Sequence, residues 1–221
     1  MVLRVGAALL EVLDQLGEPE RGAVVARLRS RHYRRSQVVF NEGDAADRLY
    51  LLQSGRMQVS ATTLQGSTII LRVVQPGEMF GALALVQPDH RRTARVCALE
   101  DCAALTLERR DFDELRLLHP GVDRLLVTVL TEQLVRSNAL AAELLLPPEI
   151  RVWRRLHVLA QAYGDDPIRM SQDDLAHAAG TVRQTANRVL QIGVRERSLA
   201  VERGVVRILD SVAIEAHSSA D

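Results

Sequence analysis

The sequence contains no lysine: all 28 of its basic residues are arginines, and 28 aspartates and glutamates balance them to a formal net charge of zero. We attribute the missing lysine to a GC-rich coding bias. The zero net charge argues neither for nor against a polyanionic partner, because only a local patch of charge can indicate one. Evidence of function must therefore come from particular stretches of the sequence.

Cysteine is scarce as well. The two that are present, Cys97 and Cys102, cannot by themselves supply the four thiolates of an iron–sulfur cluster. Five positions apart on one strand, they would point to opposite faces of a sheet. We therefore expect two small buried side chains and not a redox pair.

Long apolar runs are also missing, since no stretch approaches the roughly 18 residues needed to span a bilayer. The opening segment MVLRVGAALLEVLDQL is interrupted by Glu11 and Asp14 and is followed by no small-residue cleavage site, so it does not fit a signal peptide. These absences predict a cytoplasmic protein without a membrane partner. A chain of 221 residues is long enough for a buried core and for two modest domains.

Short β-rich runs separated by glycines follow the N-terminal segment. The runs are QVVF, RLYLLQSG, RMQVSATT, STIILRVV and ARVCALEDCAALTL, and the glycines are Gly43, Gly55, Gly66, Gly77 and Gly81. Turn signals at this spacing between short runs are typical of an antiparallel barrel or jelly roll. Residues 1–30 are expected to form amphipathic helix ahead of it.

From Arg110 onward the apolar spacing is helical, with a break at residues 119–121 and a long helix after the break. Along that helix, apolar and small residues recur at steps of three and four: Val127, Leu130, Leu134, Ser137, Ala141 and Leu144. This is the seam of a short coiled coil and predicts a parallel partner helix. The alternative is a helix packed against its own barrel. Pro147 and Pro148 end the helix and mark a domain boundary.

Two short helices about a glycine turn are expected after a further helix over residues 149–164. Ser171 can cap the first short helix with Asp174 answering three residues on, and Thr181 with Gln184 fits the same capping box for the second. Gly180 supplies a left-handed turn between them. This pattern predicts a helix–turn–helix.

The second short helix has an apolar and a polar face. Four residues are expected to face the domain core: Val182, Ala186, Val189 and Leu190. Four face outward: Arg183, Gln184, Asn187 and Arg188. Arginine suits guanine O6 and N7, and glutamine or asparagine suits adenine N6 and N7, so the polar face is suited to reading DNA bases.

Two further features support a nucleic-acid partner. From Gly180 to Arg207 six arginines stand against two glutamates, a local positive excess in a neutral chain. The run LAVERGVVRILD predicts a wing hairpin that turns at Arg203 and Gly204.

The order of barrel, long helix, proline hinge and winged helix–turn–helix resembles the CRP/FNR family of bacterial transcription regulators over nearly the whole chain. The most specific stretches are DLAHAAGTVRQTANRVL, LYLLQSGRMQV and PGEMFGALALV with RRTARV. The resemblance implies an α+β chain: an antiparallel β jelly roll of the cyclic-nucleotide-binding type over residues 1–120, a dimerisation helix over 121–146 and a winged helix–turn–helix over 147–221. It also implies a homodimer that binds double-stranded DNA and RNA polymerase and is not an enzyme.

The resemblance implies six DNA-binding residues: Thr181, Arg183, Gln184, Thr185, Asn187 and Arg188. In the family pattern, Arg183, Gln184 and Arg188 match base contacts and Thr185 matches a phosphate contact. Many members carry glutamate where Gln184 stands, so the preferred base should change from cytosine to adenine. Gly193 replaces a core leucine and is expected to end the recognition helix early.

The resemblance also implies a ligand site. In members that bind cyclic nucleotides, a Gly-Glu pair holds the ribose and an Arg-Ser/Thr pair holds the cyclic phosphate. Gly81 and the pair Arg92-Thr93 match, whereas Ala82 stands in the acidic position and cannot accept a hydrogen bond from the ribose.

The long helix contributes a second departure at this site. Members that bind cAMP place hydroxyl residues there against adenine, and the matching pair is Arg136-Ser137. Arginine only donates, which suits guanine better than the adenine amino group. Three interpretations stay open: a different nucleotide such as cGMP, or an acidic ligand; no small ligand and constitutive DNA binding; and weak binding of cAMP.

Two rival functions depend on histidines. A metal-dependent barrel enzyme of the cupin type needs clustered histidines with a carboxylate, and the barrel region offers only His32 and His90. A haem or redox sensor with the same DNA output could use His90 or His119 as an axial ligand.

Overall fold

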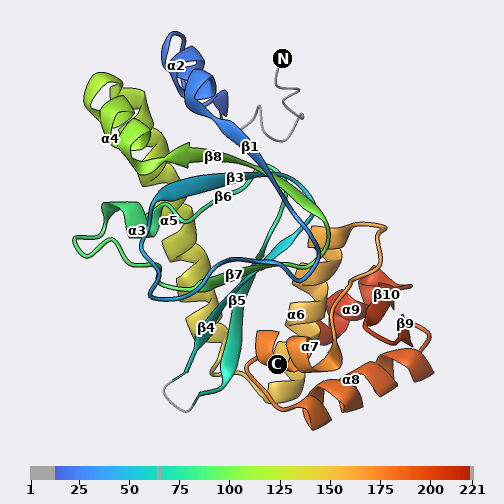
Figure 1. Cartoon of the computed structure of the whole chain (residues 1–221). Helices are drawn as coiled ribbons and strands as arrows, with labels where there is room; N and C mark the ends of the chain where they lie inside the picture. Colours follow the sequence, from blue (N-terminus) through green and yellow to red (C-terminus); the bar gives the residue numbers. More distant parts are fainter. Residues whose placement is uncertain (1–12, 64–65, 220–221) are drawn as a thin grey trace. The chain divides into compact units, whose positions relative to one another are not determined.

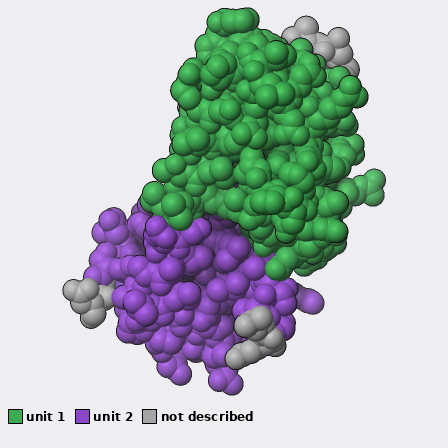
Figure 2. Space-filling model, turned by 90° about the vertical axis from the view of Figure 1, so that its left-hand side faces the viewer, with its two compact units in different colours: residues 1–59, 74–136 green, residues 60–73, 137–221 purple. Residues whose placement is uncertain are grey.

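The computed structural model describes residues 13–63 and 66–219 of the chain. Figure 1 labels its helices and strands, and Figure 2 shows in different colours the two compact units into which it divides. One comprises residues 1–59 and 74–136, and the other residues 60–73 and 137–221. Along the chain, the division falls within three elements: β4 (Met57–Thr62), β5 (Thr68–Val74) and α5 (Pro120–Glu143).

The barrel is a jelly roll of two four-stranded sheets with the strand orders β1-β8-β3-β6 and β2-β7-β4-β5. Its strands are β1 (Arg29–Tyr33), β2 (Val38–Phe40), β3 (Arg48–Ser54), β4 (Met57–Thr62), β5 (Thr68–Val74), β6 (Met79–Phe80), β7 (Arg95–Ala98) and β8 (Cys102–Glu108). The pairs β1–β8, β2–β7, β3–β6 and β3–β8 are antiparallel. The prediction of an antiparallel jelly roll is confirmed.

Three sequence-based details of this region are wrong. Residues 14–19 and 28–30 are not helical: α2 spans only Glu20–Arg27, and β1 begins at Arg29. Residues 1–12 of the expected helix lie outside the described residues. The two cysteines do not share a strand, because Cys97 lies on β7 and Cys102 on β8. Neither is in a disulfide, and only Cys102 is buried.

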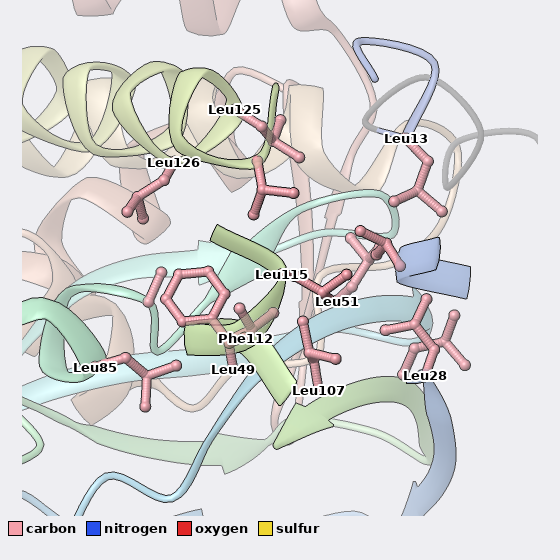
Figure 3. Packing of buried hydrophobic residues seen from close by; sticks show 14 of the residues in the cluster. Leu13, Leu28, Leu49, Leu51, Leu85, Leu107, Phe112, Leu115, Leu125 and Leu126 are labelled. Carbon is pink, nitrogen blue, oxygen red and sulfur yellow. The ribbon is translucent and has the colours of Figure 1, made fainter. Parts of the chain in front are cut away.

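One apolar cluster fixes two helices to the barrel (Figure 3). Phe112 and Leu115 of α4 (Arg109–Leu118) pack with Leu125 and Leu126 of α5 against leucines of β3 and β8. Leu115 is completely buried. Full burial of such a side chain stabilises the fold by about 1.5–3 kcal/mol. Leu115 holds α4 to the barrel in this way, and Leu125 and Leu126, each 7% exposed, hold the first turns of α5. Beyond Leu126, α5 carries mostly exposed side chains.

The other unit contains the helix–turn–helix. Its elements are α6 (Pro148–Tyr163), α7 (Gln172–Ala178), α8 (Arg183–Arg195), β9 (Leu199–Glu202), β10 (Val205–Ile208) and α9 (Ser211–Ser218). Pro147 is the N-cap of α6 and Pro148 its first residue, a position where the missing N–H costs nothing. The core centres on Trp153, Leu156 and Val189. The strands β9 and β10 pair antiparallel about Gly204, which confirms the wing hairpin.

Candidate functional site

Helices α7 and α8 form the expected helix–turn–helix. The Asp174 N–H donates to Ser171 Oγ at 3.1 Å and the Ser171 N–H donates to Asp174 Oδ2 at 3.2 Å, so the capping box of α7 is confirmed. Gly180 has a φ of +57°, the left-handed turn that the sequence predicts. These features fix the angle at which α8 leaves the turn.

The start of α8 differs from the prediction. Its N-cap is Val182, whose side chain cannot cap, and the helix begins at Arg183, so the predicted Thr181–Gln184 capping box is wrong. Val182 is 63% exposed and does not enter the core. At the N-cap its backbone is extended, which removes its side chain from the helical face that Ala186 and Val189 share.

Gly193 does not end α8 early, because the helix continues to Arg195. A Cβ at Gly193 would lie 2.5 Å from Leu199 Cδ1 and 2.7 Å from its Cγ. The glycine therefore lets the first residue of β9 pack directly against the helix backbone. Its role is close packing between the recognition helix and the wing.

The rest of the predicted apolar face is as expected, whereas Asn187, predicted to face outward, is half-buried, and its Oδ1 is buried without a hydrogen-bond partner among the described residues. Ala186, Val189 and Leu190 are buried. The six candidate DNA-binding residues lie in the turn or the first half of α8: Arg183, Gln184 and Arg188 are exposed, whereas Thr181, Thr185 and Asn187 are half-buried. The structure thus brings all six together, with three polar side chains in solvent where base edges could meet them.

Both exposed arginines have a carboxylate partner. Arg183 Nη1 donates to Asp173 Oδ2 at 3.0 Å, and Arg188 Nη1 donates to Glu149 Oε1 at 2.9 Å. Sequence reasoning missed both acidic residues. Asp173 is ten residues and Glu149 is 39 residues from its arginine, so no helical spacing connects them.

The second candidate site is the cradle around Arg92 in the jelly roll. The Arg92 side chain is only 1% exposed and points into the protein. Its Nη1 donates to the Gly81 carbonyl at 2.9 Å and its Nη2 to the Arg48 carbonyl at 2.6 Å. The guanidinium carbon lies 4.3 Å from the centre of the Phe40 ring. In the cation that the family pattern assigns to a phosphate, the two terminal nitrogens are therefore bound by the protein's own backbone, while the buried Nε has no hydrogen-bond partner among the described residues.

Charge effects around Arg92 are consistent with this burial. Removal from water lowers the pKa of Arg92, while Tyr50 and Asp47 act in the opposite direction. Asp47 Oδ1 lies 3.4 Å from Arg92 Nη2. Burial alone would raise the pKa of Asp47, but the hydrogen bond and charge of Arg48, aided by Arg92, hold it below its usual value. The carboxylate is ionised at neutral pH and balances the buried cation.

The neighbours of Arg92 are arranged for close packing. Gly81 has a φ of +79°, and a Cβ there would lie 2.7 Å from Arg92 Nη1, so any side chain would displace the guanidinium. Ala82 is 4% exposed and belongs to the leucine-rich cluster. Thr93 is exposed. The structure thus holds Gly81 and Arg92 in direct contact and directs Ala82 into the apolar core.

On α5, Arg136 and Ser137 are both exposed. Arg136 hydrogen-bonds Glu78 and, at 3.1 Å, Glu132. Glu78 follows the Gly77 turn and was not a sequence-based candidate. The Arg136 guanidinium thus already has two carboxylate partners.

His90, which either rival function could use as a ligand, lies against an arginine. His90 Nε2 lies 2.6 Å from Arg109 Nη2. Within residues 13–63 and 66–219, no three histidine, cysteine or acidic side chains come together as a metal site. No helix in the same described ranges is long and apolar enough to cross a membrane.

Comparison with known proteins supports two modules. Residues 30–118 match the family model of the cyclic nucleotide-binding domain, and residues 150–216 match that of the Crp-like helix-turn-helix domain. The cyclic AMP receptor protein of Thermus thermophilus is 30% identical over 204 residues, which cover 90% of this chain and 93% of the relative.

Two solved structures share the fold. The c-di-GMP-responsive global regulator CLP of Xanthomonas campestris superposes with a TM-score of 0.73 at 22% identity, over 87% of this chain and 99% of that one. A transcriptional regulator of the CRP/FNR family from Eubacterium rectale superposes with a TM-score of 0.77 at 16% identity, over 95% and 98%. With both modules in the same order and a relative matched over nearly its full length, the chain belongs to the CRP/FNR family of transcription regulators.

Proposed function

We propose that this protein is a homodimeric, sequence-specific DNA-binding regulator whose binding to DNA does not require cAMP. The observation that carries the DNA part is the exposed face of α8, where Arg183, Gln184 and Arg188 project from a helix fixed by a capped partner helix and a wing. Such a helix enters the major groove with its N-terminal residues on base edges.

The dimer follows from the exposed stretch of α5. Val127 and Leu134 of α5 are 63% and 59% exposed, and Leu144, which directly follows the helix, is 43% exposed; all three belong to the predicted seam. Leu130 of the same seam instead packs partly against the core of the jelly roll. A parallel copy of α5 would cover these side chains, as in a two-stranded coiled coil. Two recognition helices would then read a two-fold symmetric site with half-sites about one helical turn apart.

Independence from cAMP follows from the cradle. Arg92 already donates to two backbone carbonyls, Ala82 supplies no acceptor for a ribose hydroxyl, and Arg136 cannot accept from adenine. A missing hydrogen bond to a charged group costs about 1.5–3 kcal/mol, which is roughly one to two decades of affinity. A guanine nucleotide such as cGMP, or another acidic ligand, is the alternative effector, and the Xanthomonas relative is named for its response to c-di-GMP.

Three further properties complete the proposal. We assign the jelly roll to residues 1–120, the dimerisation helix to 121–146 and the DNA-binding domain to 147–221; the two family models, over residues 30–118 and 150–216, fall within the first and the last of these. The protein acts in the cytoplasm, with RNA polymerase as its protein partner, and has no catalytic role. A haem or redox sensor is the second candidate for its input, and visible absorbance of the purified protein distinguishes it.

The test of the dimer uses matched charge substitutions. Leu134→Glu should yield a monomer with greatly weakened DNA binding, because a glutamate would be buried in the seam. Leu117→Glu is the control, since Leu117 is 86% exposed and lies on α4 outside the seam. Sedimentation and binding to a selected palindrome measure both effects. A monomeric Leu134→Glu protein that binds DNA as tightly as the parent would refute the dimeric mode of binding.

A further inference from the structure

Each of the two arginines that would read bases donates from one terminal nitrogen to a carboxylate. The partner of Arg183 is Asp173 of α7, and the partner of Arg188 is Glu149 in the first turn of α6. In both pairs the arginine uses Nη1 alone. Within the described part of the chain, neither guanidinium has another partner.

This arrangement leaves the edge formed by Nε and Nη2 available. The five N–H groups of a guanidinium form a rigid planar fork, so one corner can bind a carboxylate while a neighbouring edge binds a second group. Guanine presents O6 and N7 side by side and accepts two parallel N–H bonds from such an edge. A carboxylate at Nη1 is therefore compatible with reading guanine at the same time.

The carboxylates also limit binding to the wrong DNA. Arg183 and Arg188 are 60% and 65% exposed. A flexible arginine so exposed can reach phosphates on any sequence, and contacts to phosphate carry no sequence information. A carboxylate at 3 Å both restrains the side chain and cancels its charge, which weakens the electrostatic attraction that drives non-specific binding.

We propose that Glu149 and Asp173 are positioning residues that set the sequence specificity of this regulator. They orient the base-reading arginines toward guanine and keep them off the phosphates of unrelated DNA. Asp173 ties α7 to the recognition helix, and Glu149 ties the start of α6 to it. The inference rests on the proposed DNA-binding function.

The decisive variant is Glu149→Ala in the full chain, with Glu202→Ala as the matched control. Glu202 is an exposed carboxylate on the wing strand β9 of the same unit, and among the described residues it has no arginine partner. Both substitutions remove one negative charge, but only the first releases Arg188. Glu149→Gln is a third variant, since its amide oxygen can still accept from Arg188 without carrying charge.

Selection from randomised half-sites and titration of unrelated DNA give the two readouts. Glu149→Ala should relax the preference at the single base pair that Arg188 contacts and raise affinity for unrelated DNA about three- to tenfold, from one released arginine and one lost repulsive charge. Glu149→Gln should keep more of that preference, and Glu202→Ala should keep all of it. Trp153, the single tryptophan and fully buried in the same unit, reports by its fluorescence that each variant is folded.

Two results would overturn the inference. An unchanged base preference in Glu149→Ala would mean that Glu149 does not orient Arg188, and a relaxation that Glu202→Ala reproduces would mean that the carboxylate acts only through its charge. If the unmodified protein itself selected no motif, the proposed function would fail, and this inference with it; a parent motif that Glu149→Ala retains overturns the inference alone.

Discussion

Replacing Arg92 by alanine separates a structural role for this residue from a ligand-binding one. The substitution removes two hydrogen bonds to the carbonyls of Gly81 and Arg48, a contact with Asp47 and the stacking on Phe40. A buried carbonyl left without a donor costs about 1–3 kcal/mol, and a buried cation–π contact is worth about 2 kcal/mol. Relief of the cost of burying the cation offsets part of this loss. We expect Arg92→Ala to lower the free energy of unfolding by about 3–5 kcal/mol.

Urea unfolding followed by far-UV circular dichroism measures this change. Tryptophan fluorescence, which reports on Trp153 in the other unit, shows whether the loss is confined to the jelly roll. Arg91→Ala is the matched control. The Arg91 side chain is exposed, and among the described residues it donates only to the Gly43 carbonyl, so the free energy of unfolding should fall by less than about 1 kcal/mol. If Arg92→Ala were as stable as the parent and lost only nucleotide binding, Arg92 would face a ligand and our description of the cradle would be wrong.

Four further substitutions test the two sites and the core. Arg188→Ala should cost on the order of 1–3 kcal/mol and relax preference at one base pair, whereas Thr185→Ala should weaken all sequences alike; an unchanged motif from randomised half-sites in Arg188→Ala would contradict the orientation of α8. Ala82→Glu supplies the acidic residue of the family pattern, but Ala82 is 4% exposed among leucines. Calorimetry should therefore show a lower melting temperature rather than tighter nucleotide binding, because the new carboxylate would be buried. Tighter binding at unchanged stability would contradict the placement of Ala82 in the core. Burial raises the pKa of the Cys102 thiol to about 11, so at pH 8 a thiol reagent should modify Cys97 well before Cys102. The folded state holds this proton more tightly than the unfolded state, so the contribution of Cys102 to the free energy of unfolding is complete below about pH 9 and declines as the pH rises toward 11. Cys102→Ala should flatten that decline, and an equally steep decline in the variant would exclude Cys102 as its cause.

The elements that the sequence predicts best are those whose pattern arises from neighbours along the chain. The β-rich runs, the Ser171–Asp174 box and the Gly180 turn depend on local periodicity and local hydrogen bonds, and the structure contains all of them. Strand β1 was missed because its RSRHY sequence is almost wholly exposed, so no apolar alternation marks it. Its strand conformation depends on pairing with β8, more than 70 residues away.

The candidate sites show the same limit. The sequence pattern identifies Arg92 and Arg188, but not the direction in which either side chain points. That direction depends on Gly81, Arg48 and Glu149, which only the folded chain brings near them. Gly193 was misjudged for the same reason, because its close contact is with Leu199 on the following strand.

The most direct test of the proposed function is a DNA titration with and without cAMP. The unmodified full-length protein is titrated with its selected palindrome at fixed salt, alone and with saturating cAMP or cGMP, while calorimetry measures binding of each nucleotide. We predict that the protein alone binds the palindrome as a dimer and that cAMP changes this affinity less than about fivefold, below the usual range of allosteric coupling. Tight binding of cAMP together with a gain in DNA affinity on the order of 100-fold would contradict the proposal and mark the protein as a cAMP-dependent regulator.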